Sequence, residues 1–123
     1  MVGDEGEIES LPTSGVLTSP NFPSRYPNNH DSTQTIQVAE GKTIRITFTS
    51  FSTDVGYDFV HIFNEDGTNL GTNIWSPNLD GRGNLSGHRI PRVRDSNSNI
   101  VHVRFQTDSS GADTGWSLDW EEL

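Results

Sequence analysis

Apolar and polar residues alternate along several short stretches of the chain, a pattern typical of strands that bury one face. No window keeps a helical period over three turns, so strands are the only regular elements that we predict. Residues 59–63 form a denser apolar run. The inward positions predicted by the alternation are Ile36, Val38, Ile44, Ile46, Phe48, Val101, Val103, Phe105, Trp116, Leu118 and Trp120.

Turn-forming residues separate these stretches at short intervals. Clusters rich in Gly, Pro, Asn, Asp and Ser occupy residues 19–29, 64–67, 79–84 and 94–99. Many short strands joined by such turns predict an all-β fold, an antiparallel sandwich of two sheets. At 123 residues the chain is long enough for one domain with its own core.

Residues 1–12 carry four acidic side chains and no clear period. We interpret them as an acidic leader or a linker, and we place the folded domain at residues 13–123.

The net charge of the chain limits the classes of partner that it can bind. Seventeen Asp and Glu residues against eight Lys and Arg give a formal net charge of −9, which repels nucleic-acid phosphates and anionic membranes. We therefore expect no nucleic-acid partner. No apolar stretch approaches the roughly 18 residues of a membrane span, so we also expect no membrane insertion. The acidic excess favours cations: basic patches of proteins, or a metal that prefers oxygen ligands.

Two kinds of chemistry are excluded or disfavoured by residue content. The chain has no cysteine, which rules out disulfides, zinc-thiolate sites and thiol catalysis. No nucleophile motif surrounds its serines, and we expect no enzymatic activity.

Six segments, taken in order, closely resemble the CUB domain family. They are "GVLTSPNFPSRYPNN", "TIQVAEGKTIRITFTSF", "YDFVHIF", "LSGHRIP", "NIVHVRFQTDSS" and "TGWSLDWEE". The resemblance covers about Gly15 to Glu121, and the ordered set is far more specific than any one segment. It implies a jelly-roll-like sandwich of two antiparallel sheets, and typically an extracellular module that binds proteins or, in some members, sugars.

The chain departs from the family at its missing disulfides. Ser32 and Ser86 stand where cysteines are expected, and the segment before Tyr57 lacks its cysteine. A cysteine-free branch of the family and engineered removal of the cysteines both fit this pattern. If the protein is secreted, as the resemblance implies, its signal segment is absent from this sequence.

The resemblance also implies a calcium site. In calcium-binding members of the family, acidic and hydroxyl side chains converge at one end of the sandwich, and the matching positions here are Asp54, Asp58, Asp108 and Ser110. A backbone carbonyl near Ser110 or Gly111, with water, would complete the shell. Calcium takes about six to eight oxygen ligands and offsets the repulsion between neighbouring carboxylates.

Without the resemblance, the favoured interpretation of the three aspartates is that they are turn formers whose side chains accept backbone N–H groups. With it, we expect Ca²⁺ to order the loops, which then present acidic oxygens to a Lys or Arg of a protein partner. Asp113 is interpreted as a turn residue at the rim. Residues 64–69 lack the spacing of a calcium loop and predict a hairpin turn at Asp66-Gly67.

Two alternatives to a protein-binding module stay open. Trp75 lies in a polar segment, where it either stacks on a sugar ring, making the chain a carbohydrate-binding module, or packs beneath a loop. A structural accessory domain of a secreted protease is the other alternative.

Overall fold

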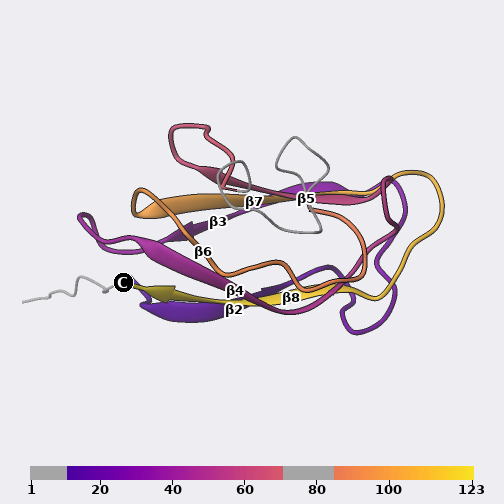
Figure 1. The fold of residues 1–123 in the computed structure, drawn as a ribbon, viewed down its shortest axis with the longest axis horizontal. Helices are drawn as coiled ribbons and strands as arrows, with labels where there is room; N and C mark the ends of the chain where they lie inside the picture. Colours follow the sequence, from indigo (N-terminus) through magenta and orange to yellow (C-terminus); the bar gives the residue numbers. More distant parts are fainter. Residues whose placement is uncertain (1–10, 71–84) are drawn as a thin grey trace, which may run out of the picture.

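A computed structural model describes residues 11–70 and 85–123 of the chain. Within these ranges the chain forms seven strands arranged in two antiparallel sheets, as the alternation predicts (Figure 1). The strands are β2 (Ser14–Thr18), β3 (Asp31–Gln37), β4 (Ile44–Ser52), β5 (Phe59–Asn64), β6 (Arg94–Asp95), β7 (Ile100–Gln106) and β8 (Gly115–Glu122).

One sheet has the strand order β2-β8-β4-β6 and the other β3-β7-β5. The long strands β8 and β7 lie in the interior of their sheets, where each pairs with a neighbour on both sides. Neighbouring strands are therefore often distant in sequence, and the loops that join them must cross the ends of the sandwich. None of the residues described belongs to a helix long and apolar enough to cross a membrane.

The core contains every inward position predicted from the alternation. All eleven are at most 9% exposed, and the two tryptophans expected in the core, Trp116 and Trp120, are 1% and 9% exposed. Aromatic rings meet edge to face between the sheets: the Trp116 centroid lies 5.8 Å from that of Phe105 and 6.1 Å from that of Phe48. Such contacts add to the stabilisation that burial of the apolar area provides.

Phe51 was not among the predicted core positions, because it has the wrong parity for the face that Phe48 occupies. A β-bulge explains its burial: Phe48 pairs with Leu118 and Ser50 with Ser117, so one extra residue lies between them on β4. The extra residue reverses the alternation. Phe51 then faces the core at 4% exposure, with its ring centroid 5.3 Å from that of Phe48.

Three loops meet at the end of the sandwich opposite the C-terminus (Figure 1). They connect β2 to β3, β4 to β5, and β7 to β8. Backbone hydrogen bonds join the first to the third: the Asn29 N–H donates to the Asp108 carbonyl at 2.7 Å, and the Tyr26 N–H donates to the Asp113 carbonyl at 3.1 Å. This loop end is the part of the fold that carries the acidic residues singled out in the sequence.

Candidate metal centre

Three carboxylates come together at the loop end of the sandwich. Asp54 and Asp58 lie in the connection from β4 to β5, and Asp108 follows β7. One oxygen from each carboxylate lies within 4.8 Å of the other two. We call Asp54, Asp58 and Asp108 the acidic triad. Asp54 and Asp58 are four positions apart along the chain, whereas Asp58 and Asp108 are fifty positions apart and are brought together by the pairing of β5 with β7.

Asp58 is the buried member of the acidic triad, with no exposed surface. Its Oδ1 accepts a hydrogen bond from the Asp108 N–H at 2.9 Å, and its Oδ2 accepts one from the Tyr26 hydroxyl at 2.6 Å. Burial raises the pKa of the Asp58 carboxyl, the two hydrogen bonds lower it, and the charges of Asp108 and Asp54 raise it further; the net shift is upward. A cation placed among the three carboxylates would remove that unfavourable charge interaction.

Tyr26 supports the acidic triad from the β2–β3 loop. Its hydroxyl donates to Asp58 and accepts a hydrogen bond from the Asp54 N–H at 3.1 Å. The side chain is 2% exposed, and burial together with the Asp58 hydrogen bond raises the pKa of its phenol. We did not predict a role for Tyr26 from the sequence. Its place within the segment "SPNFPSRYP", one of the most specific pieces of the resemblance, was the signal available.

Ser110 and Gly111 lie in the same loop as Asp108. The Ser110 N–H donates to Asp108 Oδ1 at 3.3 Å, so Asp108 also acts as the turn former that the alternative interpretation predicted. Gly111 has φ +83°, a conformation that side chains with a Cβ rarely adopt. A Cβ there would overlap Asp54 Oδ2. A glycine at this position therefore lets the loop approach the acidic triad closely.

Asp113 lies near the acidic triad in the β7–β8 loop, where its Oδ1 accepts a hydrogen bond from the Thr114 N–H at 2.7 Å and its Oδ2 lies 3.7 Å from His88 Nδ1. The hairpin turn predicted at Asp66-Gly67 is confirmed. Residues 64–68 form the expected hairpin turn: the Gly67 N–H donates to the Asn64 carbonyl at 2.9 Å. Trp75 lies outside the described residues, so the interpretation that it stacks on a sugar stays a prediction.

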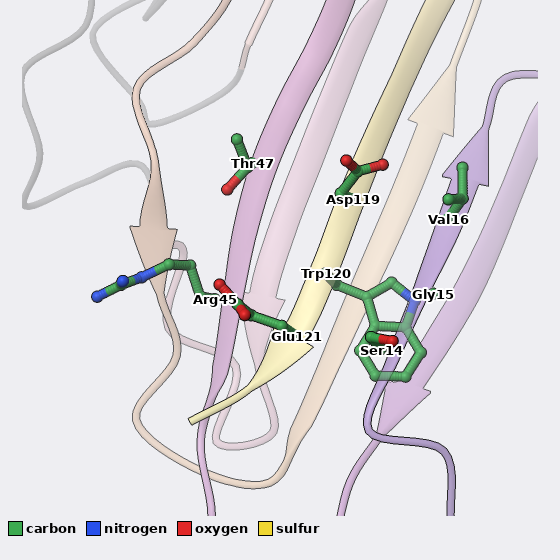
Figure 2. A pocket seen from close by; sticks show the side chains of 8 residues that line it. All are labelled: Ser14, Gly15, Val16, Arg45, Thr47, Asp119, Trp120 and Glu121. Carbon is green, nitrogen blue, oxygen red and sulfur yellow. The ribbon is translucent and has the colours of Figure 1, made fainter.

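A hollow with a volume of about 450 Å³ lies on the outer face of the four-stranded sheet (Figure 2). Arg45 and Glu121, which pair across β4 and β8, lie on it near the end of β4 opposite the acidic triad. Its one aromatic residue, Trp120, is 9% exposed and offers no open ring for a sugar. The hollow is lined by Ser14, Gly15, Val16, Arg45, Thr47, Asp119, Trp120 and Glu121.

The donors of the acidic triad are carboxylate oxygens, which suit a hard cation such as calcium. Asp54 and Asp108 are half-buried, so the cluster opens to solvent on one side. The nearby Ser110 hydroxyl and the loop carbonyls around Gly111 are of the same donor class. The residues present thus fit a calcium ion chemically, and they offer no nitrogen or sulfur donor that would favour a softer metal.

The chain was compared with known proteins. The family model described as "CUB domain" matches residues 6–120. Rat cubilin is 30% identical over 125 residues, which cover 98% of this chain and 3% of that protein. Rat mannan-binding lectin serine protease 1 is 25% identical over 114 residues, covering 87% of this chain and 14% of that protein. The chain thus spans a small part of the relatives it matches.

A solved structure of similar extent is that of the MASP-1 CUB2 domain bound to Ca²⁺. It superposes with a TM-score of 0.71 at 24% identity, covering 91% of this chain and 95% of that one. At this identity the likeness establishes the fold alone. That neighbouring domain is nevertheless a calcium-bound example of the same sandwich.

Proposed function

The chain belongs to the CUB domain family, and we propose that it is a non-catalytic extracellular module for calcium-dependent binding to proteins. The acidic triad of Asp54, Asp58 and Asp108 would hold Ca²⁺, with Ser110 and the backbone at Gly111 beside them. The ordered loops would then receive Lys or Arg side chains of a partner. Calcium bound there would supply charge neutralisation and would fix the loops.

The observation that carries this proposal is that three carboxylates, one of them the buried Asp58, each place an oxygen within 4.8 Å of the other two. Carboxylates this close repel one another unless a proton or a cation lies among them. Arg45 pairs with Asp95 and Arg104 pairs with Asp31, so these two cations do not neutralise the acidic triad. A metal ion bound among the three carboxylates would neutralise this charge.

The proposed binding of a basic protein partner rests on the charge of the chain. A formal net charge of −9 favours association with basic surfaces. Asp54 and Asp108 keep part of their surface exposed, so their oxygens remain open to a basic side chain while facing the ion. Hydrogen bonds between ammonium or guanidinium groups and carboxylates are about twice as strong as neutral ones.

Capture of a lysine-rich model peptide by the surface-immobilised protein tests whether the chain binds a basic partner. We expect binding in calcium that is lost in chelator, lost with the acetyl-lysine version of the peptide, and lost in Asp108→Asn. Asp119→Asn, which removes the same charge from an exposed residue of β8, serves as the control and should bind like the wild type. Binding that is equal in calcium and chelator, or equally weakened in both variants, would mean that only overall charge attracts the peptide.

A further inference from the structure

The loop from Asp54 to Asp58 carries two members of the acidic triad on a tight turn. The Asp54 carbonyl accepts hydrogen bonds from the Tyr57 N–H at 3.1 Å and from the Asp58 N–H at 3.0 Å. Gly56, at φ +81°, supplies the left-handed residue of the turn. The Gly56 N–H and the Asp58 carbonyl point away from these bonds and need partners from elsewhere in the chain.

Ser86 supplies a partner to both groups with one hydroxyl, and the Asp58 carbonyl also accepts a longer hydrogen bond from Thr53 Oγ1 at 3.3 Å. Its Oγ accepts a hydrogen bond from the Gly56 N–H at 2.9 Å and donates to the Asp58 carbonyl at 2.8 Å. The Asp54 carbonyl lies 3.3 Å from the same oxygen. Because the hydroxyl has a single proton, the shorter contact with Asp58 is the favoured acceptor. At 7% exposure of Ser86, water has little access to replace these bonds.

The segment that carries Ser86 is fixed on both sides. On one side, Leu85 and Val60 exchange two backbone hydrogen bonds of 2.9 Å each. On the other, the Thr53 N–H donates to the Gly87 carbonyl at 2.8 Å, and the Gly87 N–H donates to Thr53 Oγ1 at 2.9 Å. The Ser86 hydroxyl is therefore held in a rigid frame, and the turn of the acidic loop is held by that hydroxyl.

We propose that Ser86 is a positioning residue for the metal centre: its hydroxyl clamps the 54–58 turn so that Asp54 and Asp58 keep the spacing that binds Ca²⁺. This inference rests on the proposed calcium site. The clamp joins the turn to the 85–88 segment by hydrogen bonds, in a chain that has no cysteine to join them covalently. Residues that orient metal ligands typically change metal affinity by about 10- to 100-fold when removed.

Calorimetric titration of Ca²⁺ into chelator-stripped wild type, Ser86→Ala and Ser96→Ala tests the proposal. Ser96 is the matched control, because it is equally buried at 7% exposure and its hydroxyl also bridges two backbone groups, the Ile44 N–H at 2.9 Å and the Ser98 carbonyl at 2.7 Å. We expect both variants to melt at lower temperature without calcium. Only Ser86→Ala should bind calcium about tenfold or more weakly.

Two measurements keep the test decisive if Ser86→Ala folds poorly. Ser86→Cys keeps the side-chain shape with a somewhat larger atom and a weak hydrogen-bonding group, so it leaves no cavity and should still lose calcium affinity. Amide exchange at Gly56 should accelerate in Ser86→Ala and stay unchanged in Ser96→Ala. Calcium binding to wild type with unchanged affinity in the Ser86 variants would overturn this inference alone. A wild type that binds no calcium would overturn the proposed function and, with it, this inference.

Discussion

The Tyr26 hydroxyl can be removed without changing the packing around it, which makes Tyr26→Phe a direct probe of how the acidic triad is supported. The ring is 2% exposed and meets Phe105 edge to face at 4.9 Å, and Phe keeps that contact. The substitution removes the 2.6 Å hydrogen bond to the Asp58 carboxylate and the 3.1 Å bond from the Asp54 N–H.

The expected loss follows from these two bonds. A hydrogen bond to a charged group contributes about 1.5–3 kcal/mol, and a neutral one about 1 kcal/mol. Because the Asp54 N–H is only partly buried and water replaces part of its bond, we expect a total loss of about 2–3 kcal/mol in the free energy of unfolding. For a domain of this size, that corresponds to a fall in Tm of roughly 10 °C.

Urea unfolding at neutral pH in chelator, followed by tryptophan fluorescence, measures this loss, because Trp116 and Trp120 are both buried. Tyr57→Phe is the matched control: this second tyrosine is 65% exposed, and a surface change of this kind stays within about 0.5 kcal/mol. If Tyr26→Phe also stays within about 0.5 kcal/mol of the wild type, the hydroxyl does not support the buried carboxylate and the reasoning fails.

Three other changes have predictable outcomes. Gly111→Ala should lower the free energy of unfolding by about 1–3 kcal/mol because of backbone strain. It should also weaken calcium binding, because the new Cβ overlaps Asp54 Oδ2. Gly41→Ala has the same positive φ but meets no atom within 4 Å, so calorimetry should show unchanged calcium affinity for this control. Arg94→Met should raise the free energy of unfolding by about 1 kcal/mol or more. The Arg94 side chain is 1% exposed, two of its nitrogens lack a described hydrogen-bond partner, and burial lowers its pKa to about 10. A lower urea midpoint in this variant would contradict the prediction. Because the pKa of Tyr26 is raised in the folded state, its contribution to the free energy of unfolding is complete below its ordinary pKa of 10.0 and is lost as the pH rises toward the folded-state pKa. Urea denaturation at increasing alkaline pH should therefore show a steeper loss of unfolding free energy in the wild type than in Tyr26→Phe. Equal slopes would refute this prediction.

The strands could be predicted from sequence because each depends on local alternation. Ile44, Ile46 and Phe48 face the core for the same reason that any half-buried strand alternates. Phe51 escaped the prediction because the bulge that turns it inward is a property of the pairing between β4 and β8. Arg94 pairs with the buried Ile46 and shares its face, although an arginine in a strand ordinarily predicts an outward position.

The candidate site was only partly accessible from sequence. The acidic residues stood out through the family resemblance, since an aspartate beside glycines and serines is equally typical of a turn. Tyr26 lies 32 residues from Asp58, and Ser86 lies 30 from Gly56. Neither spacing has a local signature, because both contacts arise from loops that meet only when the two sheets pack.

Calorimetric titration of Ca²⁺ into chelator-stripped wild type and Asp108→Asn is the direct test of the proposed calcium site, with Asp119→Asn as a control for charge alone. We predict one calcium site in the wild type and in Asp119→Asn, and a large loss of calcium affinity in Asp108→Asn. Some extracellular calcium modules have a Kd as weak as about 10⁻⁴ to 10⁻³ M, so the titration must extend to millimolar calcium. No binding heat in the wild type at those concentrations, or equal binding in Asp108→Asn, would contradict the account.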